Sequence, residues 1–462
     1  MHDVPAARAG QTAFPADFAW GVASASYQIE GSATADGKGP SVWDMFCRKP
    51  GAVWGGQNGD VACDGYRLWR EDVRLLKELG IRAYRFSLSW PRVLPEGTGA
   101  VNPKGLDFYS RFVDGLLEAG VEPWVTLFHW DYPLALYHRG GWLNRDSAQW
   151  FADYASSAAE ALSDRVSHWM TLNEPQCFIG LGLQTGYHAP GDQLRLDEVL
   201  RAGHHALLAH GMGVQAIRAA ARSPVYVGMA PVGVVAMPAA ETSADIEAAR
   251  RSTFSVIRRD CFSTSWWMDP VFLGRYPQDG LALFGDAAPR AAPGDMETIA
   301  QPLDFCGVNI YHGSFVQAGL GGAPEDVPLP PGYPKTSFEF WPITPTCLYW
   351  GPRFLHERYG QPVVITENGH QNVDIVALDG KVHDPERIDY LHRHLRELSR
   401  AHRDGVAIKG YFQWCFTDNF EWACGDSSRN GIVFTEYATQ ARIPKDSAYW
   451  YREVIRTNGA GL

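Results

Sequence analysis

Short apolar runs rich in β-branched residues alternate along the chain with longer stretches in which apolar residues recur every three or four positions. The first pattern is typical of buried strands and the second of amphipathic helices. Their alternation predicts an α/β fold of βα units around a parallel sheet. The predicted strands are Phe18–Ala23, Ala83–Ser87, Pro123–Phe128, Trp169–Leu172, Val225–Ala230, Phe305–Asn309, Val363–Thr366 and Gly410–Trp414. Eight strands indicate a single (β/α)8 TIM barrel over residues 1–462, with the active site at the C-terminal ends of the strands.

The segments between these strands contain helix signals and one long loop. Asp384 followed by Pro385 predicts the start of the helix before the last strand, with Asp384 as its N-cap. The Gly- and Pro-rich segment Gly319–Lys335 is predicted to be a long loop after the sixth strand, and such loops commonly form the substrate mouth of a barrel. Helical periodicity is clearest over Tyr66–Gly80, Leu106–Gly120 and Asp146–Leu162.

Charge and hydropathy exclude several classes of partner. The net charge of −11, with no long Lys/Arg run, argues against a nucleic-acid partner. No apolar stretch reaches the roughly 18–20 residues of a membrane-spanning helix, so no membrane partner is expected. The N-terminal segment Met1–Gly10 has no apolar core, so it does not read as a secretory signal.

The chain contains 8 cysteines, which are scattered and form no Cys-x-x-Cys pair. Cys306 and Cys415 lie in or beside apolar runs, where cysteine usually behaves as a small hydrophobe. We therefore expect reduced thiols and a cytoplasmic protein. Several histidines lie in predicted helices without nearby cysteines or a matching carboxylate pattern, so no metal or cofactor is predicted. These histidines are His204, His205, His210, His392 and His394.

Two glutamates stand at the ends of buried-strand runs. Glu174 lies in Thr171–Pro175 and Glu367 in Ile365–Gly369. In a single parallel barrel both would emerge on the same face, and glycoside cleavage needs two carboxylates that face each other across one bond. The alternative is that each glutamate is a solvated turn residue. The flanking sequences, Asn-Glu-Pro and Glu-Asn-Gly, favour the catalytic pair.

Four further strings accompany the two glutamate segments: Gln28–Gly31, Tyr84–Ser87, Phe128–Asp131 and Asp418–Trp422. Together the six segments resemble glycoside hydrolase family 1, the β-glucosidase family, from about Phe14 to about Ile455. The resemblance implies a retaining mechanism with Glu174 as acid/base and Glu367 as nucleophile, through a covalent glycosyl-enzyme. It implies no cofactor.

The same resemblance assigns four residues that support the catalytic pair. Asn173 would bind the sugar 2-hydroxyl. Arg85, ending the second strand, would hold the nucleophile ionised, although an Arg in a structural ion pair at the barrel end is the alternative. Asn309 and Tyr311 match the family's Asn-x-Tyr, and Tyr311 would orient Glu367 through a hydrogen bond.

The remaining matches imply a pocket for the non-reducing sugar. Gln28 and Glu421 would clamp its hydroxyls, and His129 would serve the 3-hydroxyl. Trp414 would form a stacking floor and Trp422 would donate its indole N–H. The last two members are Trp130, expected as a wall or packing residue, and Asn430.

Asn430 departs from the family pattern, which usually has Phe at this position near C6 of the sugar. Its smaller, polar side chain predicts tolerance of altered C6 groups, unless the loop has rearranged and Asn430 faces solvent. Aromatic residues are also usual where Asp426 and Ile310 stand. None of these departures touches the catalytic pair.

These observations predict a retaining β-glucosidase with β-galactosidase or β-fucosidase side activity. The thioglucosidase branch of the family replaces the acid/base glutamate, so the presence of Glu174 predicts O-glycoside substrates. Glu421 beside Trp422 favours unphosphorylated sugars. Expected partners are cello-oligosaccharides or aryl and alkyl β-glucosides; a homo-oligomer is left open. The alternatives are a transglycosylase or a specialist for C6-substituted β-glycosides, and a catalytically silent carbohydrate-binding barrel, which both carboxylates disfavour.

Overall fold

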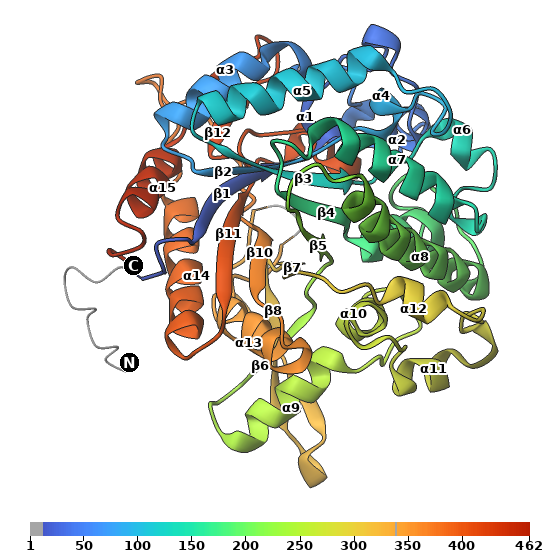
Figure 1. Ribbon diagram of the computed structural model, residues 1–462. Coiled ribbons are helices and arrows are strands. Elements are labelled where there is room, and N and C mark those ends of the chain that lie inside the picture. Colours follow the sequence, from blue (N-terminus) through green and yellow to red (C-terminus); the bar gives the residue numbers. More distant parts are fainter. Residues whose placement is uncertain (1–12, 338–339) are drawn as a thin grey trace.

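The computed structural model describes residues 13–337 and 340–462, so the expectation for Met1–Gly10 lies outside the described residues. Its centre is a sheet of eight parallel strands (Figure 1). Each predicted strand is present, and its ends differ from the prediction by two residues at most. The strands are β1 (Ala19–Ser24), β2 (Ala83–Ser87), β3 (Glu122–Phe128), β4 (His168–Asn173), β5 (Tyr226–Ala230), β7 (Cys306–Asn309), β10 (Val363–Asn368) and β11 (Ile408–Trp414).

The strand order is β5-β4-β3-β2-β1-β11-β10-β7. The two end strands meet through backbone hydrogen bonds from the Asp304 N–H to the Val227 carbonyl (2.9 Å) and from the Asn309 N–H to the Pro231 carbonyl (3.0 Å). The sheet is therefore nearly closed, and the predicted (β/α)8 TIM barrel is confirmed. That residues 1–462 form one domain stays a prediction.

Helices surround this barrel (Figure 1). α3 is amphipathic and buries Trp69, Val73 and Leu76 on its inner face, as its apolar spacing predicts. The longer helices are α3 (Gly65–Glu78), α5 (Pro103–Glu118), α7 (Ser147–Leu162), α8 (Leu196–Ala220), α9 (Ser243–Phe254), α10 (Thr264–Leu273), α13 (Cys347–Tyr359), α14 (Pro385–Arg403) and α15 (Asp446–Arg456). The shorter ones are α1 (Ser26–Ile29), α2 (Val42–Phe46), α4 (Trp90–Val93), α6 (Leu134–Tyr137), α11 (Gln278–Phe284) and α12 (Asp295–Ile299).

The predicted start of α14 is confirmed, but the function of its first carboxylate is different. Asp384 occupies the N-cap position before Pro385, yet its side chain makes no capping bond to its own helix. It accepts hydrogen bonds from the Ser447 N–H (2.9 Å) and hydroxyl (2.6 Å), and pairs with Arg387. A charge partner and a second helix therefore compete successfully for this buried carboxylate.

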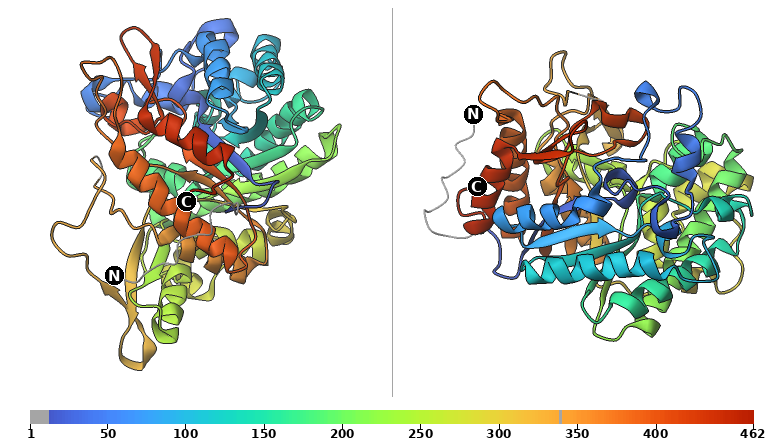
Figure 2. Two further views of the ribbon diagram at one scale, coloured as in Figure 1. Left: turned by 90° about the vertical axis from the view of Figure 1, so that its left-hand side faces the viewer. Right: turned by 90° about the horizontal axis from the view of Figure 1, so that it is seen from above.

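The prediction of a continuous loop over Gly319–Lys335 is wrong in part. Its segment β9 (Pro324–Val327) pairs antiparallel with β8 (Gly313–Ala318), which also pairs with β6 (Val235–Pro238). Pro, Glu and Asp are poor strand formers, but an exposed edge strand needs only backbone pairing on one side. Figures 1 and 2 show α9 and the β8–β9 hairpin side by side, projecting from the barrel. A second hairpin joins β12 (Val433–Glu436) to β13 (Ala441–Pro444).

The cysteines and the helix histidines His204 and His210 are buried in the fold. All eight cysteines are free and buried, which confirms the expectation of unpaired thiols. His204 contacts Asp295 (2.9 Å) and His210 contacts the Thr171 hydroxyl (2.6 Å). Within residues 13–337 and 340–462, no three His, Cys, Asp or Glu side chains are grouped to hold a metal ion. None of the helices in these ranges is both long and apolar enough to cross a membrane.

Candidate active site

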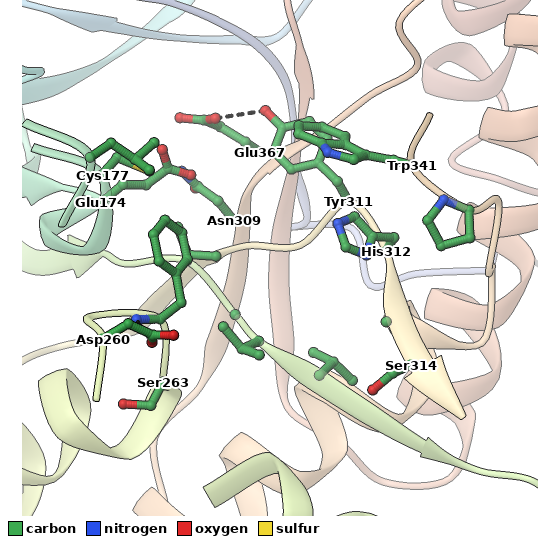
Figure 3. A pocket seen from close by; sticks show the side chains of 18 of the residues that line it. Glu174, Cys177, Asp260, Ser263, Asn309, Tyr311, His312, Ser314, Trp341 and Glu367 are labelled. Atoms are coloured by element: carbon green, nitrogen blue, oxygen red, sulfur yellow. Dashed lines mark hydrogen bonds between the residues drawn. The ribbon is translucent and has the colours of Figure 1, made fainter. Parts of the chain in front are cut away.

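A cavity of about 980 Å³ opens at the C-terminal ends of the barrel strands. This volume is at the upper end of the range for ligand pockets. Both predicted catalytic glutamates line the cavity, and Figure 3 shows them with the residues around them. Three residues of the segment predicted to be a loop, Asp326, Val327 and Leu329, also line the cavity, so that segment does contribute to the mouth.

Glu174 follows β4, and its surroundings favour the protonated form of its carboxyl group. Its φ of 46° lies in the left-handed region, which non-glycine residues occupy mostly at functional sites. Its N–H donates to the Ala230 carbonyl of β5 (2.9 Å), and its carboxyl accepts from the Asn309 amide (2.9 Å). Burial, together with the negative charge of Glu367, raises the pKa of Glu174 to about 8. At neutral pH it is therefore a proton donor.

Glu367, near the end of β10, has an opposite environment. Arg85 donates to one carboxylate oxygen (2.6 Å) and the Tyr311 hydroxyl to the other (2.7 Å; Figure 3). Burial raises the pKa of Glu367 above its ordinary value, although Arg85 and Tyr311 oppose part of that rise. The arrangement favours an ionised carboxylate beside a protonated one.

Arg85 is the middle residue of β2 rather than its last. Its long side chain nevertheless reaches the strand ends, where it also donates to the Thr366 carbonyl (3.0 Å). Both interpretations of Arg85 therefore describe one contact, because the buried ion pair at the barrel end is the pair with Glu367.

One hydrogen-bond network joins the two glutamates. The side-chain oxygen of Asn173, Oδ1, accepts from Arg85 (2.6 Å) and from the Asn309 amide (3.0 Å). These two donors fix the orientation of the Asn173 amide, so its nitrogen points at His129 Nε2 (3.2 Å). Burial lowers the pKa of His129 well below its ordinary value, so its ring is neutral and Nε2 is the acceptor.

The predicted sugar-binding residues gather at another part of the same cavity. The cavity lining includes His129, Trp130, Trp414, Glu421, Trp422 and Asn430. Gln28 is fully buried behind them and donates to the Phe420 carbonyl (3.0 Å). Its Oε1 finds no donor among the described residues, which is unusual for a buried amide.

The aromatic members of this group form a continuous wall. Trp414 stacks on His129 with ring centroids 5.6 Å apart, and Trp130 packs against Trp422 at 4.5 Å. The Trp130 indole N–H donates to the Asn173 carbonyl (3.0 Å). Trp130 therefore both packs and lines the cavity.

Asn430 belongs to the pocket, so the solvent-facing alternative is wrong. Its side chain is 2% exposed and donates to Glu421 Oε2 (3.0 Å). The Cys415 N–H holds its carbonyl in place (3.1 Å). Asp426 instead accepts from the Gln57 amide (2.9 Å) and is absent from the cavity lining.

Sequence reasoning missed the part of the cavity that lies beyond the catalytic pair. Here the lining includes Val235 of β6. It also includes His312 just before β8, Ser314 in β8 and Asp260 after α9 (Figure 3). Trp341 packs on Tyr311 with ring centroids 5.1 Å apart. The sequence carries little signal for this part, because β8 shows no strict alternation of apolar and polar residues.

The family model described as Glycosyl hydrolase family 1 matches residues 10–460. The chain belongs to glycosyl hydrolase family 1. It is 45% identical to a 1,4-beta-D-glucan glucohydrolase of Thermotoga neapolitana, over 96% of this chain and 99% of the relative. It is 40% identical to a bifunctional beta-D-glucosidase/beta-D-fucosidase of Bifidobacterium breve, over 97% and 99%. A solved family 1 structure, the beta-glucosidase from Thermotoga maritima in complex with glucoimidazole, superposes with a TM-score of 0.88 at 45% identity, over 96% and 99%.

Proposed function

We propose that this family 1 enzyme is a retaining β-glucosidase that hydrolyses terminal, non-reducing β-D-glucosyl residues of O-glycosides. The proposal depends on one observation: two buried carboxyls line one cavity in opposite environments. Asn309 contacts Glu174, whose pKa is raised to about 8, whereas Glu367 lies between Arg85 and Tyr311. A proton donor and an anionic nucleophile are the two groups that retaining cleavage requires.

In the first step Glu367 attacks the anomeric carbon while Glu174 donates its proton to the departing oxygen. The C–O bond to the leaving group breaks and an ester forms between the sugar and Glu367. In the second step Glu174, now a carboxylate, takes a proton from water, which attacks the anomeric carbon and releases Glu367. Two inversions give net retention.

The substrates proposed are cello-oligosaccharides and aryl or alkyl β-glucosides, with β-galactoside or β-fucoside side activity. The name of the Bifidobacterium breve relative supports the fucoside part. The buried, unpaired acceptor of Gln28, beside Glu421, suits sugar hydroxyls. A cytoplasmic location is proposed from the eight free cysteines.

Product analysis tests this function and separates it from the alternatives. The enzyme is incubated with 4-nitrophenyl β-D-glucoside and with a panel of β-linked disaccharides. Release of glucose as the main product is expected. No turnover of either substrate would indicate a silent carbohydrate-binding barrel, and predominantly longer products would indicate a transglycosylase.

The pH profile of kcat/KM should be a bell with its alkaline limb governed by Glu174. Activity needs Glu174 protonated, so it falls as pH rises through the apparent pKa of the pair's acid, about 8. On the acid side activity falls as Glu367 becomes protonated. Initial rates on an aryl β-glucoside measured across pH check this, and a rate that is flat from acid to alkaline pH would contradict it.

Asn430→Phe should raise the preference for glucosides over C6-substituted analogues. Phenylalanine fills the space next to Glu421 and removes the amide that now donates to it. A contact of this size shifts selectivity by roughly 10–200-fold at most. The ratio of kcat/KM for the two substrate types is compared in the parent and the variant. Asn430→Ala, which removes the hydrogen bond without adding bulk, is the control; an unchanged ratio in Asn430→Phe refutes a role in the pocket.

A further inference from the structure

The sugar-binding residues Glu421 and Asn430 lie on one irregular segment between β11 and β12. Apart from a short 3-10 turn over Trp422–Ser427, this segment has no regular structure. Its position must therefore be fixed by side-chain contacts. The contacts that do so are buried and charged.

One carboxylate ties the two ends of the segment together. Asp418, three residues before Glu421, is fully buried. Its Oδ1 accepts from the N–H of Gly431, the neighbour of Asn430 (3.0 Å), and its Oδ2 accepts from Arg429 (2.7 Å). The same Oδ1 accepts from the Lys445 ammonium (2.7 Å). Asp418 thus holds the entry and the exit of the segment together.

Lys445 connects this carboxylate to the loop that follows the nucleophile. It is fully buried, and its ammonium pairs with Asp374 as well as with Asp418. Asp374 lies on the loop that leaves β10, the strand of Glu367. Arg387 of α14 pairs with Asp374 (2.8 Å) and also donates to the Arg429 carbonyl (2.9 Å).

The network is balanced, with three cations (Lys445, Arg387, Arg429) against three carboxylates (Asp374, Asp384, Asp418). Burial alone would raise the pKa of Asp374, but Arg387 and Lys445 lower it to about 2. Buried ion pairs contribute little net stability compared with apolar packing. A fixed geometry is the better explanation for fully burying five of these six charges next to a binding pocket.

We propose that Lys445 is a positioning residue that fixes Glu421 relative to Glu367 by bridging Asp418 and Asp374. The inference rests on the proposed function, because Glu421 is taken as a sugar-binding group. Lys445 itself is absent from the cavity lining, so it acts only through the segment it holds. Its loss should therefore weaken sugar binding more than it slows the bond cleavage.

The test is Lys445→Met, which keeps the length of the side chain and removes its charge. KM for 4-nitrophenyl β-D-glucoside should rise by about 10-fold, a size typical of residues that act through neighbours. kcat should change by less than about threefold. Lys409→Met is the matched control. Lys409 lies on β11 and makes an exposed ion pair with Asp17 (3.2 Å), so this variant should leave both constants unchanged. Parent turnover of the same substrate tests the proposed function separately.

A double-mutant cycle with Glu421→Ala distinguishes positioning from a structural role. If Lys445 acts through Glu421, Lys445→Met should change KM by less than about twofold in the Glu421→Ala background. Equal KM effects in both backgrounds, or a folded Lys445→Met enzyme with parent KM, would overturn the proposal. Should Lys445→Met not fold, Arg429→Lys, at a partly exposed side chain, replaces it in the cycle with the same criteria.

Discussion

Replacing Glu367 with Ala is expected to abolish glucoside hydrolysis, by at least about 10⁴-fold in kcat, as loss of a nucleophile does in other covalent enzymes. The carboxylate is placed by two donors, Arg85 at 2.6 Å and Tyr311 at 2.7 Å, and no other carboxylate among the described residues has both contacts. Added azide or formate should enter the space left by the side chain and partly restore the reaction. Since the anion attacks once, the rescued product has the inverted configuration.

The measurement is kcat on an activated aryl β-glucoside with and without azide, together with the anomeric configuration of the product. Glu297→Ala, an exposed residue on α12, is the control and should retain parent activity. Near-normal turnover in Glu367→Ala, or a rescued product of retained configuration, would remove Glu367 from the nucleophile role.

Glu174→Gln should slow glycosides with poor leaving groups by about 10²–10⁴-fold while affecting activated aryl glucosides far less. Glutamine has the same shape, and its side-chain oxygen can still accept from the Asn309 amide, but it carries no acidic proton to donate to the leaving group. Acid assistance matters most when the departing oxygen is basic. In the variant, kcat/KM should therefore fall far more for methyl β-D-glucoside or disaccharides than for 4-nitrophenyl β-D-glucoside.

The check is kcat/KM for both substrate types in parent and variant, with the pH profile recorded on the activated one. The alkaline limb, which depends on the Glu174 proton, should disappear in the variant. Equal losses on both substrate types would exclude Glu174 as the acid.

The sequence predicts the barrel well where burial and periodicity agree. β2 begins and ends where its pattern predicts, at Ala83 and Ser87, because all five of its side chains are buried. The sequence does not predict the edge strand β9, because its Pro, Glu and Asp residues are poor strand formers that pair with β8 through the backbone. The intrinsic strand propensities of residues carry no information about such backbone pairing.

The candidate site shows a similar limit. Short motifs identify Glu174 and Glu367 because each ends a buried strand, and the strand ends bring them together. The Lys445–Asp374 pair spans 71 residues and has no local signal. For Asn430 the sequence left open whether the amide faces solvent or the pocket, since only the loop geometry decides this.

The central claim, a covalent intermediate on Glu367, is tested most directly by trapping that intermediate. A 2-deoxy-2-fluoro-β-glucoside with an activated leaving group slows the second step more than the first, so the glycosyl-enzyme accumulates. Peptide mass spectrometry after proteolysis should place one fluoroglucosyl group on Glu367. A label on another residue, or no covalent adduct under conditions in which the parent substrate is turned over, would contradict the account.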